Sequence, residues 1–349
     1  MPHLPPGPTP ATLLPMFVHL AVWLHDIDPY AIKLWDGGPI RWYGLSYLLG
    51  FAIAYLLIRR VARVGNNSMP AKRVADLVVA LAIGIVIGGR LGYVFFYRPA
   101  LLWDFSAAVP FWGVLAINKG GMASHGGMIG GIVAAVLFAR RHQQPIMHLL
   151  DLLAFATPLG LFFGRIANFV NGELFGRPCD PDFPLAVKFP QELADWTADE
   201  LNYLAGQLKL DAVSYDSLIS HVLDRIQAGD QLIINTVQPL LTPRHPSQLY
   251  AAVLEGLVVF AILLFAWRRP RKPGTIGGLF CISYALMRIV NECFRMPDTH
   301  LLNCEFAVFG ITRGQWLSVL LFIFGLIILW FAQSARTSPM GGYLHTDMQ

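Results

Sequence analysis

The sequence predicts an all-α polytopic membrane protein with seven transmembrane helices and an extracytoplasmic head between the fourth and fifth helices. Of its 349 residues, 55% are hydrophobic and only 14% are charged, and the mean hydropathy is +0.52. This composition is typical of chains whose main solvent is lipid. Seven apolar runs are of the length expected for membrane crossings. They cover residues 43–58, 75–97, 122–139, 146–164, 247–267, 274–291 and 315–333.

Clusters of basic residues predict the orientation of these runs, because Lys and Arg in short loops stay on the cytoplasmic side. Such clusters follow the first, third and fifth runs. They are Arg59, Arg60, Arg63, Lys72 and Arg73, then Arg140 and Arg141, then Arg268, Arg269, Arg271 and Lys272. We therefore expect an extracytoplasmic N-terminus, a cytoplasmic C-terminus and even-numbered runs that travel outward.

The soluble segments lie between and outside the apolar runs. The predicted parts are an extracytoplasmic or interfacial arm (1–42), helices one to four (43–171), the head (172–246), helices five to seven (247–333) and a cytoplasmic tail (334–349). The head carries half of the chain's 22 acidic residues. Within it, Thr197 and Glu200 predict a capping box, and apolar residues from Leu218 to Ile226 predict one face of a helix that ends at Gly229.

The four cysteines do not have the spacing of metal ligands, so we expect no metal site. They are Cys179, Cys281, Cys293 and Cys304. All except Cys281 would lie in or near an oxidising space, where a disulfide can form, but the sequence does not determine its pairing. We also expect no cofactor and no nucleic-acid partner.

Six polar side chains fall near the outer ends of the apolar runs in this orientation. They are Tyr43, Arg90, His125, Arg165, Arg288 and Glu292. An arginine in hydrocarbon costs about 2.5–3.5 kcal/mol on insertion scales, so three at one depth favour a shared anionic partner. The phosphate of a lipid headgroup fits, because a guanidinium binds phosphate through a fork of donors.

These residues can instead have structural roles that involve no ligand. Arginines near helix ends often extend to headgroups without a further role, and Arg288 and Glu292 are spaced to pair with each other on a helix. His125 lies in GGMASHGGMIGG (120–131), whose glycines allow either close helix packing or close approach of a ligand to the backbone. Its imidazole can accept a proton at neutral pH or act as a hydrogen-bonded structural group.

Six blocks of sequence, in order, resemble the prolipoprotein diacylglyceryl transferase family. They are RWYGLSY (41–47), GGRLGYVFFY (88–97), HGGMIGG (125–131), GRIANFVNGELFGRP (164–178), RHPSQLYAAVLEG (244–256) and MRIVNECFRMPD (287–298). The resemblance runs from Trp42 to Trp330. The head segment at about 180–243 is longer than the family pattern, so its contacts with a substrate are not predicted.

The resemblance implies transfer of the sn-1,2-diacylglyceryl group from phosphatidylglycerol to a cysteine thiol. The acceptor would be the lipobox cysteine in the signal peptide of a preprolipoprotein, and the products a thioether and glycerol 1-phosphate. The reaction would occur at the periplasmic leaflet of a bacterial inner membrane, among membrane lipids. His125 matches an essential histidine of the family and is expected to take the thiol proton. Arg165 and Arg288 match essential arginines and are expected to neutralise charge on the phosphate leaving group.

Other residues that match the family pattern have less defined roles. Gly176 matches an essential glycine, whose backbone can approach a ligand or turn where a side chain would clash. Four more residues match important positions of the family: Tyr43, Asn168, Glu173 and Glu292. They are expected to bind substrate, to orient the arginines or to move protons. More structural roles are expected for Asn171 as a cap, for Arg90, and for Glu255 as a buried helix partner.

Two other classes remain as alternatives: another phospholipid-handling membrane enzyme and a lipid transporter. The sequence lacks the aspartate-rich motif of the CDP-alcohol phosphotransferases and the GxSG of the rhomboid proteases. A transporter should show repeated halves or broken helices in matched positions, and no internal repeat is visible.

Overall fold

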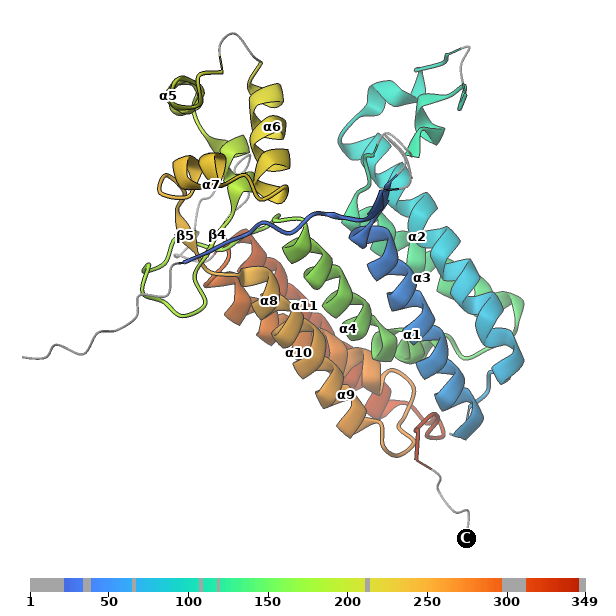
Figure 1. The fold of residues 1–349 in the computed structure, drawn as a ribbon. Helices are drawn as coiled ribbons and strands as arrows, with labels where there is room; N and C mark the ends of the chain where they lie inside the picture. Colours follow the sequence, from blue (N-terminus) through green and yellow to red (C-terminus); the bar gives the residue numbers. More distant parts are fainter. Residues whose placement is uncertain are drawn as a thin grey trace, which may run out of the picture.

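The computed structural model describes residues 22–33, 39–64, 67–106, 109–117, 120–210, 214–296 and 312–344. Cys304, most of the predicted N-terminal arm and the last residues of the predicted tail lie outside this part of the chain. The fold is mostly helical, and its long helices form one bundle with a cluster of short helices at one end (Figure 1).

A helix occupies each of the seven predicted apolar runs. These helices are α1 (Trp42–Val64), α2 (Val74–Phe96), α3 (Ser124–Arg141), α4 (Ile146–Val170), the continuous α8–η6–α9 helix (Ser247–Ala251, Ala252–Val258 and Val259–Ala266), α10 (Thr275–Glu292) and α11 (Arg313–Ser334). Within the described residues, five helices are long and apolar enough to cross a membrane, and α3 and α10 are the two that fall short. The chain is therefore a polytopic membrane protein.

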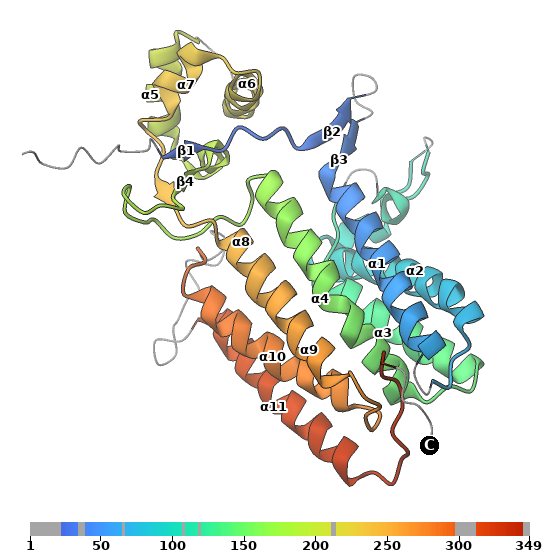
Figure 2. The same ribbon diagram turned by 60° about the horizontal axis from the view of Figure 1, so that its bottom comes forward.

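The bundle is assembled from helix pairs (Figure 2). The most extensive contacts join α2 with α3, α10 with α11, and α1 with α4. A hydrophobic core forms where the helices meet away from the short-helix cluster, and its fully buried members include Ile58, Leu77, Leu149, Phe155 and Trp267. This core fixes the relative positions of α4, α9 and α10.

Glycines form the contact between α2 and α3. A Cβ atom added at Gly88 would lie 2.7 Å from the Cα of Gly130, and one at Gly92 would lie 2.8 Å from the Cα of Gly126. Real Cβ contacts are not this short, so the two backbones can approach only because side chains are missing. Of the two predicted uses of these glycines, the structure has close helix packing.

The end of the bundle opposite the short helices is closed by polar contacts to buried backbone. Asp151 of α4 is buried, and its carboxylate accepts hydrogen bonds from the backbone N–H groups of Gly274 and Gly277, both at 2.7 Å. It thereby caps the N-terminus of α10 in place of a local capping residue. Beside it, Arg271 and Met340 exchange two backbone hydrogen bonds.

The short helices fill the segment that the sequence assigns to the head. They are α5 (Ala198–Leu208), α6 (Tyr215–Gln227) and α7 (Gln231–Val237), preceded by η5 (Pro190–Asp195). The predicted capping box of Thr197 and Glu200 is present. The predicted face of α6 is also confirmed, because Leu218 and Ile226 are buried in a separate hydrophobic cluster with residues of α5 and α7.

Short strands connect the chain before α1 to this cluster. The strands are β1 (Trp23–Leu24), β2 (Tyr30–Lys33), β3 (Pro39–Arg41), β4 (Val187–Lys188) and β5 (Pro243–Arg244). β1 pairs in parallel with β4, and β4 pairs antiparallel with β5, whereas β2 and β3 form a hairpin before α1. The beginning of the described chain is thus joined to the segment between α4 and α8.

Candidate active site

Arg165 of α4 and Arg288 of α10 bind the same carboxylate. Nη2 of Arg165 lies 3.1 Å from Oε2 of Glu255, and Nη1 of Arg288 lies 3.2 Å from Oε1. The amide of Asn291 donates a third bond to Oε1, at 3.0 Å. Glu255 is 0% exposed. The side chains of Arg165 and Arg288 are 20% and 12% exposed, so both are mostly buried but still partly accessible.

Local backbone geometry brings Glu255 to the two arginines. The residue lies in η6, a π-helical segment of the α8–η6–α9 helix, and such segments often occur at functional sites. Gly256, the next residue, packs against Phe162 of α4, where a Cβ would lie only 2.7 Å from the Cβ of Phe162. Because Arg165 follows Phe162 by three residues, this close approach places its side chain beside Glu255.

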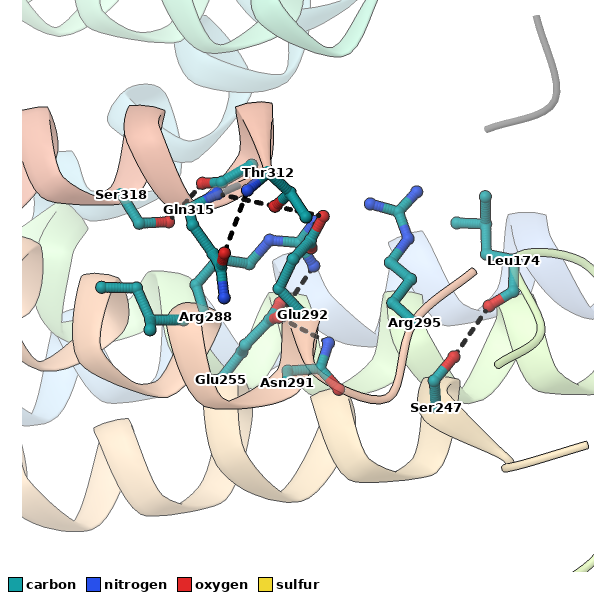
Figure 3. A network of polar contacts seen from close by, with 12 residues as sticks. Leu174, Ser247, Glu255, Arg288, Asn291, Glu292, Arg295, Thr312, Gln315 and Ser318 are labelled. Carbon is teal, nitrogen blue, oxygen red and sulfur yellow. Dashed lines mark hydrogen bonds and ion pairs between the residues drawn. The ribbon is translucent and has the colours of Figure 1, made fainter. Parts of the chain in front are cut away.

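Glu292 pairs with Arg288 and also touches the start of α11 (Figure 3). Its Oε2 lies 2.8 Å from Nη2 of Arg288, which confirms the predicted pairing of the two residues. Its Oε1 accepts a hydrogen bond from the hydroxyl of Thr312, the N-cap of α11, at 3.4 Å. A Cβ at Gly314 would lie 2.6 Å from that oxygen. The carboxylate thus lies at a helix N-terminus, which favours negative charge.

Tyr43 and Asn168 join α1 to the outer part of α4. The side-chain amide of Asn168 donates to the Tyr43 hydroxyl over 2.5 Å. The ring of Tyr47 packs beside Tyr43 with centroids 5.6 Å apart, and both tyrosines are within electrostatic range of Arg165 and Glu173. Three of the predicted site residues therefore lie in the neighbourhood of Arg165.

The signature segment after α4 is held between two other parts of the chain. Asn171 is the C-cap of α4, as predicted, and its amide donates to Glu173 over 2.8 Å. The backbone N–H of Gly176 donates to the carbonyl of His245 over 2.9 Å. A Cβ on Gly176 would lie 2.7 Å from the carbonyl oxygen of Phe294. Glycine is required at this position by the close approach of two backbone segments.

Arg90 does not belong to this group. Its guanidinium donates four hydrogen bonds to backbone carbonyls, namely those of Gly113, Val114, Gly120 and Gly121, at 2.6–3.0 Å. The side chain is buried, and most of its five donors are used. The structural reading of Arg90 is therefore confirmed, and the prediction that three arginines share one anion is wrong for this residue.

His125 lies in the first turn of α3, on a different helix pair from the two arginines. Its side chain is exposed. In the described part of the chain, no hydrogen bond or ion pair joins it to Arg165 or Arg288. The structure therefore leaves its ring nitrogens available to a substrate and does not test its predicted role.

Two side chains near the arginines have contacts that the sequence did not predict. Glu255 is buried as predicted, but it also connects Arg165 with Arg288. Tyr284, four residues before Arg288 on α10, interacts with Arg165 and was not predicted at all. The available signal for Glu255 was a carboxylate inside an apolar run, which requires a charged partner. In the described residues, no group of three His, Cys, Asp or Glu side chains could hold a metal ion.

Comparisons with known proteins agree over nearly the whole chain. The family model for prolipoprotein diacylglyceryl transferase matches residues 29–331. Among similar proteins, the phosphatidylglycerol–prolipoprotein diacylglyceryl transferase of Bdellovibrio bacteriovorus is 46% identical, over 88% of this chain and 93% of the relative. The enzymes of the same name from Rhodospirillum rubrum and Idiomarina loihiensis are 38% and 35% identical, each over 90% of this chain and 96% of the relative.

Proposed function

Because this chain belongs to the prolipoprotein diacylglyceryl transferase family, we propose that it transfers the sn-1,2-diacylglyceryl group of phosphatidylglycerol to the lipobox cysteine of a preprolipoprotein. A carbon–sulfur bond forms at the glycerol carbon, and the bond from that carbon to the phosphate oxygen breaks. The products are a thioether-linked lipoprotein precursor and glycerol 1-phosphate. The observation that carries the proposal is the pair of partly exposed arginines, from α4 and α10, that meet at one carboxylate.

Arg165 and Arg288 bind the phosphate of phosphatidylglycerol. Both arginines are partly exposed, and each guanidinium has five donors. The phosphate gains one negative charge when it leaves as a monoester. Fixed donors at the position of developing charge stabilise the transition state, and each can contribute a factor of about 10²–10³ in rate.

His125 accepts the proton of the cysteine thiol. A free thiol has a pKa of about 8.5 and is a weak nucleophile, whereas the thiolate attacks carbon readily. An exposed imidazole at the start of α3 is available to a peptide that approaches from outside the bundle. Neutral imidazole is a suitable acceptor at neutral pH.

The remaining predicted residues shape the site around the phosphate. Asn168 and Tyr43 fix the outer end of α4 against α1, and Glu173 follows in the segment held by Gly176. Glu292 orients Arg288 through their ion pair. We assign these residues to substrate binding and to the orientation of the arginines.

We further propose that all seven long helices span a bacterial inner membrane. α3 and α10, with 18 residues each, are less apolar than the other five, but they pack extensively against α2 and α11. The N-terminal arm (1–42) and the head (172–246) then lie on the periplasmic side, the tail (334–349) is cytoplasmic, and the spans are grouped as 43–171 and 247–333. The basic residues after α1, α3 and α9 support this orientation.

Product analysis of the purified chain tests the function. In micelles with phosphatidylglycerol and a lipobox peptide, we expect a thioether-linked diacylglyceryl peptide by mass spectrometry and an equal amount of glycerol 1-phosphate. Failure of the folded wild-type chain to form this adduct would contradict the proposed reaction. Lipid movement without a covalent product would instead favour a transporter.

Two substitutions test the assigned roles. His125→Gln and Arg165→Ala should each lower the transfer rate by about 100-fold or more without loss of the folded state by circular dichroism. Arg225→Ala is the matched control, because Arg225 pairs with Asp230 on the exposed side of the short-helix cluster. If folded His125→Gln or Arg165→Ala protein transfers at the rate of this control, the substituted residue does not have its proposed role.

A further inference from the structure

We infer that Glu255 is a built-in counter-anion, which competes with the bound phosphate for Arg165 and Arg288 and so promotes release of the more highly charged product. This inference rests on the proposed function, since it concerns the phosphate that the reaction releases. It gives Glu255 a positioning role in turnover beyond that of a buried helix partner.

Glu255 bridges the two arginines in the way that a phosphate group could. Each of its two oxygens binds a different arginine, at 3.1 and 3.2 Å. A phosphate that bridges the same guanidinium groups would offer two oxygens in the same way. The carboxylate and the phosphate therefore draw on the same two positive charges.

Glu255 differs in this respect from the other carboxylate of the cluster. Glu292 pairs with Arg288 and with the hydroxyl of Thr312 at the start of α11. Among the described ion pairs, Glu255 joins both arginines, and it does so while fully buried. The two ion pairs offset the cost of burying this carboxylate, and Glu255 in turn offsets part of the positive charge of the two arginines.

The charge balance of the reaction makes this neutralisation useful. Arg165, Arg288 and the two glutamates that pair with them carry no net charge together. The substrate brings a phosphodiester with one negative charge, and the cysteine thiolate brings a second one. After transfer the thioether is neutral, and the phosphate monoester carries both charges. Without Glu255 the site would hold one more positive charge, and it would retain the dianion more strongly than the monoanionic substrate.

The predicted signature is therefore the preference for a dianion over a monoanion. The probes are glycerol 1-phosphate, which is largely dianionic at pH 7.5, and the monoanionic diester dimethyl phosphate. Both are measured as inhibitors of the transfer reaction and by calorimetric titration in micelles. We expect the wild-type chain to bind the two with affinities within about threefold. Glu255→Gln, which keeps the shape but not the charge, should favour the dianion by about tenfold relative to wild type.

Two comparisons separate this role from a structural one. Asp151→Asn removes another buried carboxylate, at the far end of the bundle, and should leave the dianion preference unchanged. Glu255→Asp keeps the charge and should preserve the wild-type preference even if its rate is lower. If Glu255 has only a structural role, Glu255→Gln should be less stable. It should then bind glycerol 1-phosphate and dimethyl phosphate more weakly by the same factor.

The outcomes are distinct from those that test the reaction itself. If the wild-type chain forms no thioether adduct, the proposed function fails. If it forms the adduct but Glu255→Gln shows the wild-type preference, the counter-anion role is wrong. Should Glu255→Gln not fold, the wild-type measurement decides, because a tenfold or greater preference for the dianion in the unaltered site contradicts the inference, and near-equal affinities support it.

Discussion

Glu255 and Asp151 are both carboxylates buried in the helix bundle, but they have different kinds of partner. Glu255 lies near the end that carries the short helices and binds two partly exposed guanidinium groups. Asp151 lies at the opposite end and binds two backbone N–H groups at the start of α10. The N–H groups that bind Asp151 lie at the start of a helix and serve only that contact. The arginine side chains that bind Glu255 are partly exposed and can also bind an anion from outside the protein. For a buried carboxylate, the kind of group that it binds therefore indicates a ligand-binding site better than its burial does.

The largest expected effect comes from changing a partner of Glu255. Arg288→Lys replaces a guanidinium that binds Glu255 and Glu292 through separate nitrogens with a single ammonium group. A lysine cannot reproduce this fork of donors, so we expect kcat/KM for diacylglyceryl transfer to fall about 100-fold. Arg225→Lys, on the exposed surface, serves as control. If Arg288→Lys transfers within threefold of this control, Arg288 does not form part of a phosphate site, and the contacts of Glu255 are as structural as those of Asp151.

Removing Asp151 should affect stability more than catalysis. Asp151→Ala leaves the N–H groups of Gly274 and Gly277 without their acceptor, and each unsatisfied buried group costs about 1–3 kcal/mol. We expect a clearly lower unfolding temperature in detergent, with kcat/KM per folded molecule within about threefold of wild type. A loss of kcat/KM as large as that of Arg288→Lys would mean that the capped end also controls the site.

The smallest expected effect concerns His25, a buried residue at the same end as Glu255. Its ring packs against Phe169 and Phe189 with centroids 5.3 Å from each. Burial lowers the pKa of His25 below 6.5, and the backbone carbonyl of Phe169 and the nearby Asp26 oppose this only in part. The unfolded chain therefore takes up the proton first as the pH falls. The resulting stability is present above pH 6.5 and is lost as the pH falls through the folded pKa.

The measurement is the unfolding temperature at pH 7.5 and pH 5.0 for wild type and His25→Phe. We expect the wild type to lose more stability than the variant over this interval, and we expect phosphate affinity at pH 7.5 to be the same in both. An equal loss in both proteins would show that His25 does not couple protonation to folding.

The sequence predicts the helices well because each apolar run must satisfy its backbone hydrogen bonds internally. It also predicts the pairing of Arg288 with Glu292, since four residues separate them on one helix. The link from Arg165 to Glu255 spans 90 residues of sequence and depends on the π-helical register of η6 and on the approach of Gly256 to α4. No local pattern encodes that approach.

Arg90 illustrates the limits of assigning residues by depth. It falls near the predicted outer leaflet, as Arg165 and Arg288 do. Depth, however, does not determine which way a side chain points around the helix. Four carbonyls in the segment between α2 and α3 accept hydrogen bonds from the Arg90 guanidinium. These acceptors lie in a short 3-10 helix and a loop, and hydrophobic periodicity does not predict where such carbonyls point.

The pairing of β1 with β4 has a mechanical consequence. The short-helix cluster is connected to the bundle through the exit from α4 and the entry to α8, and the parallel strand pair adds a third attachment through the chain that leads into α1. This third attachment restrains rotation of the cluster about the other two. For the proposed reaction, the short-helix cluster would then keep a fixed distance from the helix ends where peptide and lipid meet.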